Sequence, residues 1–153
     1  MPRSLTLAFV AFLAVAAGPA SAPSPRTAHG PKHELLVENT DRGTVFRIPL
    51  RPGEVFSVVY HHSIYDQPVT EDFVVDDERH LVLQAVTSPS AAVREYFGIT
   101  SAGDRHTMAR TMPEIIFRIA AGTVQHLRAG GVERSFLDLG EHGDRLVLRA
   151  TRP

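Results

Sequence analysis

The chain has no cysteine among its 153 residues. This absence excludes a disulfide framework, and it also excludes the cysteine that a bacterial lipoprotein needs for its lipid anchor. Lysine is nearly absent as well, since Lys32 is the only one and the arginines are scattered along the chain. Without a cluster of basic residues, we expect no binding to nucleic acid phosphates or to anionic membrane surfaces.

The apolar run near the N-terminus is too short to be a permanent membrane anchor. It covers residues 5–17, whereas a bilayer-spanning helix needs roughly 20 apolar residues. Arg3 precedes the run, and small residues and prolines follow it. This order is typical of a cleavable secretory signal. We therefore expect residues 1–20 to be removed after Ala20, which would leave a periplasmic or secreted protein with no stable membrane insertion.

The rest of the chain divides into a leader and one domain. Residues 21–32 are rich in Pro, Ser and Thr, which predicts a flexible leader because this composition buries little apolar surface. Residues 33–153 carry short runs of Val, Ile, Leu and Phe, separated by Gly, Pro and Asp at intervals typical of all-β proteins. One all-β domain is predicted, with strands at residues 34–39, 44–50, 55–63, 69–76, 80–87, 114–121, 124–128, 132–139 and 145–150.

The sequence thus predicts about nine strands, and the connections between most of them are only a few residues long. Parallel strands need crossovers of a dozen residues or more, so the short connections predict antiparallel pairing. The expected fold is an antiparallel β-sandwich or a partly open barrel. One stretch differs: residues 88–113 predict a long loop with room for one helical turn. This loop, which carries Tyr96, is either a binding edge or a surface excursion packed on its own side chains.

Polar side chains interrupt the apolar face of the predicted hairpin at residues 55–76. If residues 64–67 form its loop, Tyr60 lies opposite Glu71. Alternation then places Tyr60, His62 and Glu71 on the core-facing side, near the loop. A core-facing carboxylate is costly unless it is hydrogen bonded or protonated, and Tyr60 and His62 are the expected partners. These three residues either form a ligand site or fix the register of the sheet.

This hairpin also carries a family resemblance. It rests on three segments: Leu50-Arg51-Pro52-Gly53, Tyr60-His61-His62-Ser63-Ile64 and Gln67-Pro68-Val69-Thr70-Glu71-Asp72-Phe73. They resemble the bacterial family known as domain of unknown function 1850, over about residues 46–75 and more weakly over 115–127. Ile64 replaces the family's valine, and residues 91–98 replace its glycine-rich stretch. The resemblance implies a small exported β protein, often encoded beside tripartite ATP-independent periplasmic transporters of the TAXI type.

Two kinds of chemistry compete with simple binding. His62, Ser63 and Glu71 have the residue types of a hydrolase triad, but neighbouring residues of a strand point to opposite faces, so His62 is poorly placed to activate Ser63. The histidines and carboxylates of the hairpin suggest a metal, but His61 and His62 also alternate faces, and no H-x-H or H-E-x-x-H spacing occurs. We therefore assign no catalytic residue, no metal ligand and no cofactor.

The sequence favours a non-enzymatic periplasmic accessory or small-ligand-binding protein linked to a solute transporter. Its expected partners are transporter components or a small organic ligand. The candidate ligand-binding residues are Tyr60, His62, Ser63, Tyr65, Glu71 and Tyr96. The alternatives are a hydrolase or metalloprotein using His62 and Glu71, and a purely structural interaction domain.

Overall fold

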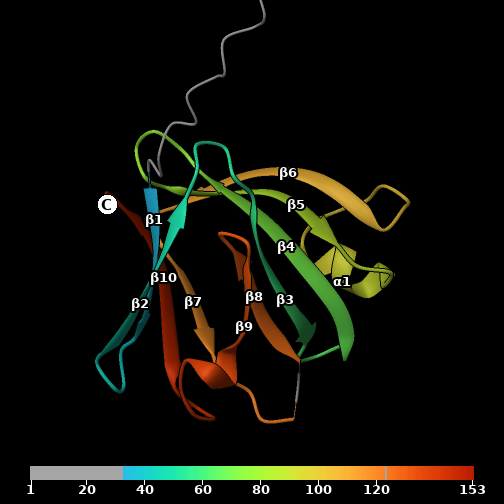
Figure 1. Ribbon diagram of the computed structural model, residues 1–153. Coiled ribbons are helices and arrows are strands. Elements are labelled where there is room, and N and C mark those ends of the chain that lie inside the picture. The colour runs from blue at the N-terminus through green and yellow to red at the C-terminus, as the bar shows by residue number, and fades with distance from the viewer. Residues whose placement is uncertain (1–32, 123) are drawn as a thin grey trace, which may run out of the picture.

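The computed structural model describes residues 33–122 and 124–153. The predicted signal at residues 1–20 and the leader at 21–32 lie outside the described residues. The prediction of an all-β antiparallel fold is confirmed, because ten strands in the described ranges form two antiparallel sheets (Figure 1). The two sheets face each other across one apolar core, which makes the domain a sandwich.

Sheet A has four strands in the order β2-β1-β10-β7. Its strands are β1 (His33–Asn39), β2 (Thr44–Leu50), β7 (Ile115–Arg118) and β10 (Arg145–Thr151). Sheet B has six strands in the order β6-β5-β4-β3-β8-β9. Its strands are β3 (Phe56–His62), β4 (Gln67–Val75), β5 (Leu81–Thr87), β6 (Arg105–Met112), β8 (Gln125–Ala129) and β9 (Val132–Ser135).

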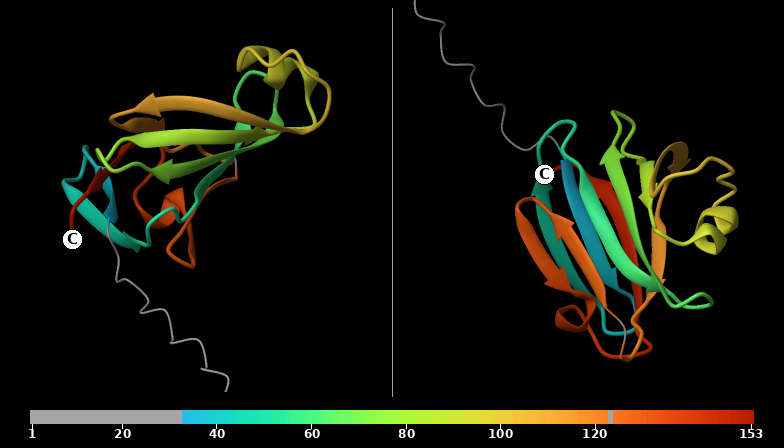
Figure 2. Two further views of the ribbon diagram at one scale, coloured as in Figure 1. Left: turned by 90° about the horizontal axis from the view of Figure 1, so that it is seen from above. Right: turned by 90° about the vertical axis from the view of Figure 1, so that its right-hand side faces the viewer.

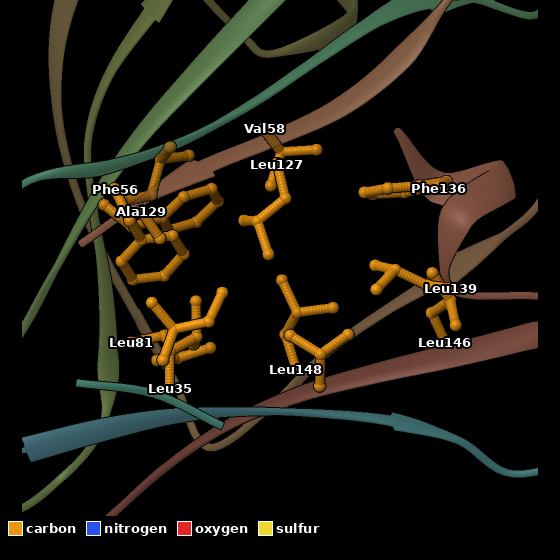
Figure 3. Packing of buried hydrophobic residues seen from close by; sticks show 14 of the residues in the cluster. Leu35, Phe56, Val58, Leu81, Leu127, Ala129, Phe136, Leu139, Leu146 and Leu148 are labelled. Carbon is orange, nitrogen blue, oxygen red and sulfur yellow. The ribbon is translucent and has the colours of Figure 1, made fainter. Parts of the chain in front are cut away.

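The core forms because apolar residues recur at every second position in most of the strands. In β1, for example, Leu35 and Val37 are fully buried while Leu36 between them is partly exposed. In Figure 3, Val58 and Leu127 of sheet B face Leu148 of sheet A across the core. Full burial of each such side chain contributes roughly 1.5–3 kcal/mol to the stability of the fold.

The loop predicted at residues 88–113 has the one helical turn that the prediction allowed, but the prediction is wrong for residues 105–112, which form a strand. It contains a short helix, α1 (Ala91–Tyr96), which Ser90 caps by accepting a hydrogen bond from the Val93 amide at 3.4 Å. It also contains the strand β6, which pairs with β5. The sequence of β6 gives only a weak apolar signal, because Met108 and Met112 pack against the core while most of this edge strand is exposed. The domain therefore has one strand more than the expected nine.

Two predicted strands are shorter than expected. The strand predicted at residues 132–139 ends at Ser135, where the 3-10 helix η1 (Phe136–Asp138) begins. A capping box explains this end: the Ser135 hydroxyl accepts from the Leu137 amide at 3.2 Å, and Asp138 accepts from the Ser135 amide at 3.1 Å. The strand predicted at 114–121 is β7, which spans only residues 115–118.

The strands define two ends of the sandwich. The C-terminus lies at one end, and the β3–β4 hairpin lies at the other (Figure 1). Strands β4, β5 and β6 reach past sheet A toward α1, so part of their inner face is not covered by the opposite sheet (Figure 2). Within the described ranges, no helix has the length and apolar character required to cross a membrane.

Candidate functional site

The β3–β4 hairpin keeps the predicted faces but has a different register. The turn occupies residues 63–66 instead of 64–67, so Tyr60 pairs with Val69, and Glu71 pairs with Val58. The predicted direct pairing of Tyr60 with Glu71 is therefore wrong. Because the pairing moves by two residues, Tyr60 and Glu71 still share the inner face and lie diagonally across the two strands.

The predicted contact between Tyr60 and Glu71 is present. The Tyr60 hydroxyl lies 2.5 Å from Oε1 of Glu71 in a hydrogen bond. Burial raises the pKa of Glu71 above its usual value, while this hydrogen bond and the positive charge of Arg110 oppose the rise. Burial and the neighbouring carboxylate also raise the pKa of Tyr60, so the phenol keeps its proton. The Tyr60 ring makes an edge contact with Phe117 of β7, with ring centres 6.1 Å apart.

His62 takes part in a separate aromatic contact instead of binding Glu71. Its ring stacks on Tyr65 at 5.0 Å and meets the edge of Tyr96 at 4.6 Å. The Ile64 amide donates a hydrogen bond to Nδ1 of His62 at 3.3 Å. An accepting Nδ1 places the proton of the neutral imidazole on Nε2. Within the described part of the chain, no hydrogen bond is found at this Nε2, so it is available to donate to a ligand.

These side chains line an open pocket of about 460 Å³ between β3 and β7. We call it the β3–β7 pocket. It is lined by Tyr60, His61, His62, Ser63, Ile64, Tyr96, Ile116, Phe117, Arg118, Ala120 and Gln125. Of the six predicted site residues, Tyr60, His62, Ser63 and Tyr96 are in this lining. Glu71 and Tyr65 are not, but each contacts a residue that is.

The sequence does not indicate the part of the pocket that β7, the residues after it and Gln125 of β8 supply. Arg118 donates a hydrogen bond to the Gly143 carbonyl at 2.9 Å and lies 3.8 Å from the Asp41 carboxylate, which holds it at the rim. Gln125 accepts from the Ala120 amide at 2.8 Å and donates to the Arg118 carbonyl at 3.0 Å. The sequence predicts both β3 and β7 as strands, but no sequence signal indicates that β7 packs against the end of β3.

The geometry gives little support to the catalytic alternatives. Ser63 is the first residue of the exposed turn, and no hydrogen bond joins it to His62 in the described ranges. A nucleophilic serine needs such a contact with its base. Among residues 33–122 and 124–153, no three His, Asp or Glu side chains gather in a way that could hold a metal ion.

Comparison with known protein families, with curated proteins and with solved structures finds no match to this chain. The resemblance to domain of unknown function 1850 therefore stays a prediction from the hairpin residues. The functional argument consequently depends on the chemistry of the β3–β7 pocket.

Proposed function

We propose that this protein is an exported, non-enzymatic domain that binds a small organic acid in the β3–β7 pocket and serves as an accessory to a solute transporter. The observation that carries the proposal is the pocket itself, into which Tyr60, His62 and Tyr96 bring aromatic surface and polar atoms. Its volume of about 460 Å³ lies within the range of roughly 300–1,000 Å³ common for small-molecule sites.

The charge of the lining favours an anion. The ionisable groups at its surface are His61, His62, Tyr60, Tyr96 and Arg118, and no Asp or Glu of residues 33–122 and 124–153 is in the lining. Glu71, the carboxylate among the predicted site residues, has a raised pKa and is bonded to Tyr60. A ligand carboxylate would meet donors and the Arg118 guanidinium at the pocket surface. The carboxylates that partner the basic side chains, Asp41 at 3.8 Å from Arg118 and Asp66 at 3.3 Å from His61, lie outside the lining.

The apolar part of the lining favours a ligand with a flat or branched hydrocarbon body. Ile116 and Phe117 come from β7, and Tyr96 comes from α1 on the other side. Tyr96 is 62% exposed and Ile116 is 47% exposed, so both retain apolar surface that a ligand could cover. Aromatic walls with a few fixed polar groups are typical of small-molecule sites.

The transporter link rests on the predicted secretory signal and on the family resemblance of the hairpin. An exported domain that binds organic acids would meet its ligand on the side of the membrane from which uptake begins. This part of the proposal depends on the segments of residues 50–73 that carry the resemblance, and the ligand-binding part does not.

Benzoate, benzamide and benzylamine test the ligand class because they share a ring and differ in charge. Each is titrated into the isotope-labelled protein, and the backbone amide signals are followed by NMR. We expect benzoate to shift the amides of β3, β7 and α1 at millimolar concentrations or below, benzamide to bind more weakly, and benzylamine to bind least. Equal shifts with all three would contradict an anion site, and no shift at these strands with any of them would contradict a ligand site.

Two tyrosines provide a matched pair of variants. Tyr96 and Tyr65 both contact the His62 ring, but only Tyr96 lines the pocket. We expect Tyr96→Ala to weaken benzoate binding by about tenfold, because the ligand loses an aromatic wall worth roughly 1 kcal/mol or more. Tyr65→Ala should change the affinity much less. Loss of binding in Tyr65→Ala alone would place the ligand outside the pocket, on the exposed turn.

A further inference from the structure

A second opening lies on another side of the sandwich, where the edge strands of the two sheets do not close. β2 is an edge of sheet A, and β9 is an edge of sheet B. Phe46 and Ile48 of β2 pair with inner-face residues of β1. Val132 and Arg134 of β9 pair with the inner-face residues Ala129 and Leu127 of β8. All four side chains are thus directed toward the gap between the sheets.

This gap is a groove with an apolar floor, which we call the β2–β9 groove. It has a volume of about 330 Å³, and its deepest lining residues, Val37, Leu127 and Leu139, are at most 4% exposed. By contrast, Phe46 is 40% exposed and Val132 is 43% exposed, although both belong to inner faces. Inner-face side chains of a closed sandwich are normally covered by the opposite sheet. The groove thus leaves core-facing apolar surface in contact with water.

One end of the groove is held by a close backbone approach. Gly130, in the β8–β9 turn, has a φ of +58°, and a Cβ at this position would lie 2.8 Å from Cγ2 of Ile48 and 2.9 Å from the Pro49 carbonyl oxygen. Only glycine fits this position without a shift of β2 or of the turn. The spacing between β2 and β9 is therefore built into the fold at this end.

The groove carries positive charge that is not neutralised by its own lining. Arg134 makes no hydrogen bond or ion pair with any residue in the described ranges, although it shares the inner face with Leu127. Arg47, the other charged lining residue, is engaged by Glu34 at 3.1 Å. Among the residues that the structure describes, no Asp or Glu lines the groove. An apolar trough with one unpaired guanidinium at its wall is complementary to a molecule with a hydrocarbon body and one negative end.

We propose that the β2–β9 groove binds a free fatty carboxylate, with its carboxylate on the Arg134 guanidinium and its alkyl chain along Val37, Leu127 and Leu139. Binding of the alkyl chain would cover the exposed inner-face surface of Phe46 and Val132. This removal of apolar surface from water would favour binding. The guanidinium would fix the direction of the chain through a paired contact with the carboxylate. This site is separate from the β3–β7 pocket and does not depend on its ligand.

Octanoate is the probe, because it stays monomeric at millimolar concentration, and 1-octanol is the uncharged control of equal length. Titration of the labelled full-length chain should shift the amides of β2, β8, β9 and Leu139 while leaving those of Tyr60 and His62 unchanged. We expect Arg134→Gln to weaken octanoate binding by about tenfold or more and to leave octanol binding nearly unchanged. Arg152→Gln, which removes an exposed arginine away from the groove, should leave both affinities unchanged.

A second variant tests the apolar part of the site without altering its charge. Val132→Phe places a larger side chain in the groove, so it should weaken octanoate and octanol alike while the protein stays folded. Octanoate shifts confined to the β3–β7 pocket would overturn the proposal, as would equal octanoate affinity in Arg134→Gln and the parent. If the protein alone forms dimers by analytical ultracentrifugation and Val132→Phe abolishes them, the groove is an interface between two copies and the proposal is wrong.

Discussion

Two of the polar clusters in the described part of the sandwich differ in how completely their hydrogen bonds are satisfied. The first, the Asn39 cluster, consists of Asn39, Arg42 and Asp144 and joins the β1–β2 turn to the start of β10. Asn39 is fully buried. Its Nδ2 donates to the Leu139 carbonyl at 3.2 Å and to Asp144 at 2.9 Å, and its Oδ1 accepts from the Asp41 and Arg42 amides. These four bonds use the whole capacity of the amide.

Asp144 binds three donors through one of its carboxylate oxygens. Its Oδ2 accepts from Asn39, from the Glu141 amide at 2.9 Å and from Nε of Arg42 at 2.5 Å. The chain also passes so close at Gly140 that an added Cβ would lie 2.2 Å from Nδ2 of Asn39 and 2.7 Å from Oδ2 of Asp144. The centre of the Asn39 cluster is therefore closed, because Asn39 has no unused donor or acceptor and the close approach at Gly140 leaves no space there for another molecule.

The second cluster consists of Tyr60, His62 and Glu71, and we call it the Tyr60 cluster. Tyr60 and Glu71 bind each other, but Tyr60 also lines the β3–β7 pocket, and Nε2 of His62 has no hydrogen-bond partner in the described ranges. The difference suggests a rule for this fold. Polar groups with every bond made inside the protein hold the chain in place, whereas polar groups with capacity left over beside a pocket are suited to a ligand.

The largest predicted effect is the loss of stability in Asn39→Ala. The change leaves buried donors and acceptors of the β1–β2 turn, Leu139 and Asp144 without their partner, and we expect the free energy of unfolding to fall by about 3 kcal/mol. Urea denaturation measures this fall. Thr40→Ala is the control, because the Thr40 hydroxyl is exposed and makes only a 3.4 Å contact with the Arg145 carbonyl, so it should cost under about 0.5 kcal/mol. Similar losses in the two variants would refute the structural role of the Asn39 cluster.

A smaller effect on stability is predicted for the Tyr60 cluster. Tyr60→Phe keeps the ring against Phe117 but removes the hydroxyl that binds Glu71. We expect the free energy of unfolding to fall by about 1 kcal/mol and benzoate binding to weaken. Tyr65→Phe removes an exposed hydroxyl from a neighbouring ring and should change neither quantity. A loss as large as that of Asn39→Ala, with benzoate affinity unchanged, would make this cluster structural as well.

The hairpin shows how a wrong register can still predict the right faces. The predicted loop at residues 64–67 lies one residue later than the observed turn at residues 63–66, which shifts the pairing by two positions along the partner strand. Side chains alternate with a period of two, so Tyr60 and Glu71 remain on one face, and only their direct opposition is lost. The apolar alternation of β3 and β4 is thus sufficient to predict the Tyr60–Glu71 contact, and it does not determine the turn.

Other parts of the structure leave no comparable signal in the sequence. β6 is an edge strand whose inner face extends past sheet A, so it carries Arg110 where a covered strand would carry an apolar residue. Ile116 and Arg118 reach the β3–β7 pocket because sheet A packs on sheet B, and local patterns do not encode which strands meet across a core. Asn39 looks like an ordinary turn residue in the sequence, and only its burial reveals its role.

The pH dependence of stability should separate the two clusters by sign. Hydrogen bonds from the backbone amide of Glu141 and from the side chains of Asn39 and Arg42 lower the pKa of Asp144 to about 2, from a usual value of 3.8. Its contribution to stability is therefore complete above pH 3.8 and is lost as the pH falls from there toward about 2. The pKa of Glu71 is raised above 4.5 because of burial. The folded state then holds this proton more tightly than the unfolded state, so stability declines as the pH rises from 4.5 through the raised pKa.

Replacing each carboxylate by its amide should remove one of these two trends and leave the other. Relative to the parent, Asp144→Asn should lose less stability between pH 3.8 and about pH 2, and Glu71→Gln should lose less as the pH rises above 4.5. The urea midpoints of the parent and both variants, measured across this range, give the two differences directly. Because other carboxylates titrate equally in all three proteins, each difference belongs to one residue. A Glu71→Gln profile parallel to the parent above pH 4.5 would mean that Glu71 is ionised at no cost, and the Tyr60 cluster would then be as fully satisfied as the Asn39 cluster.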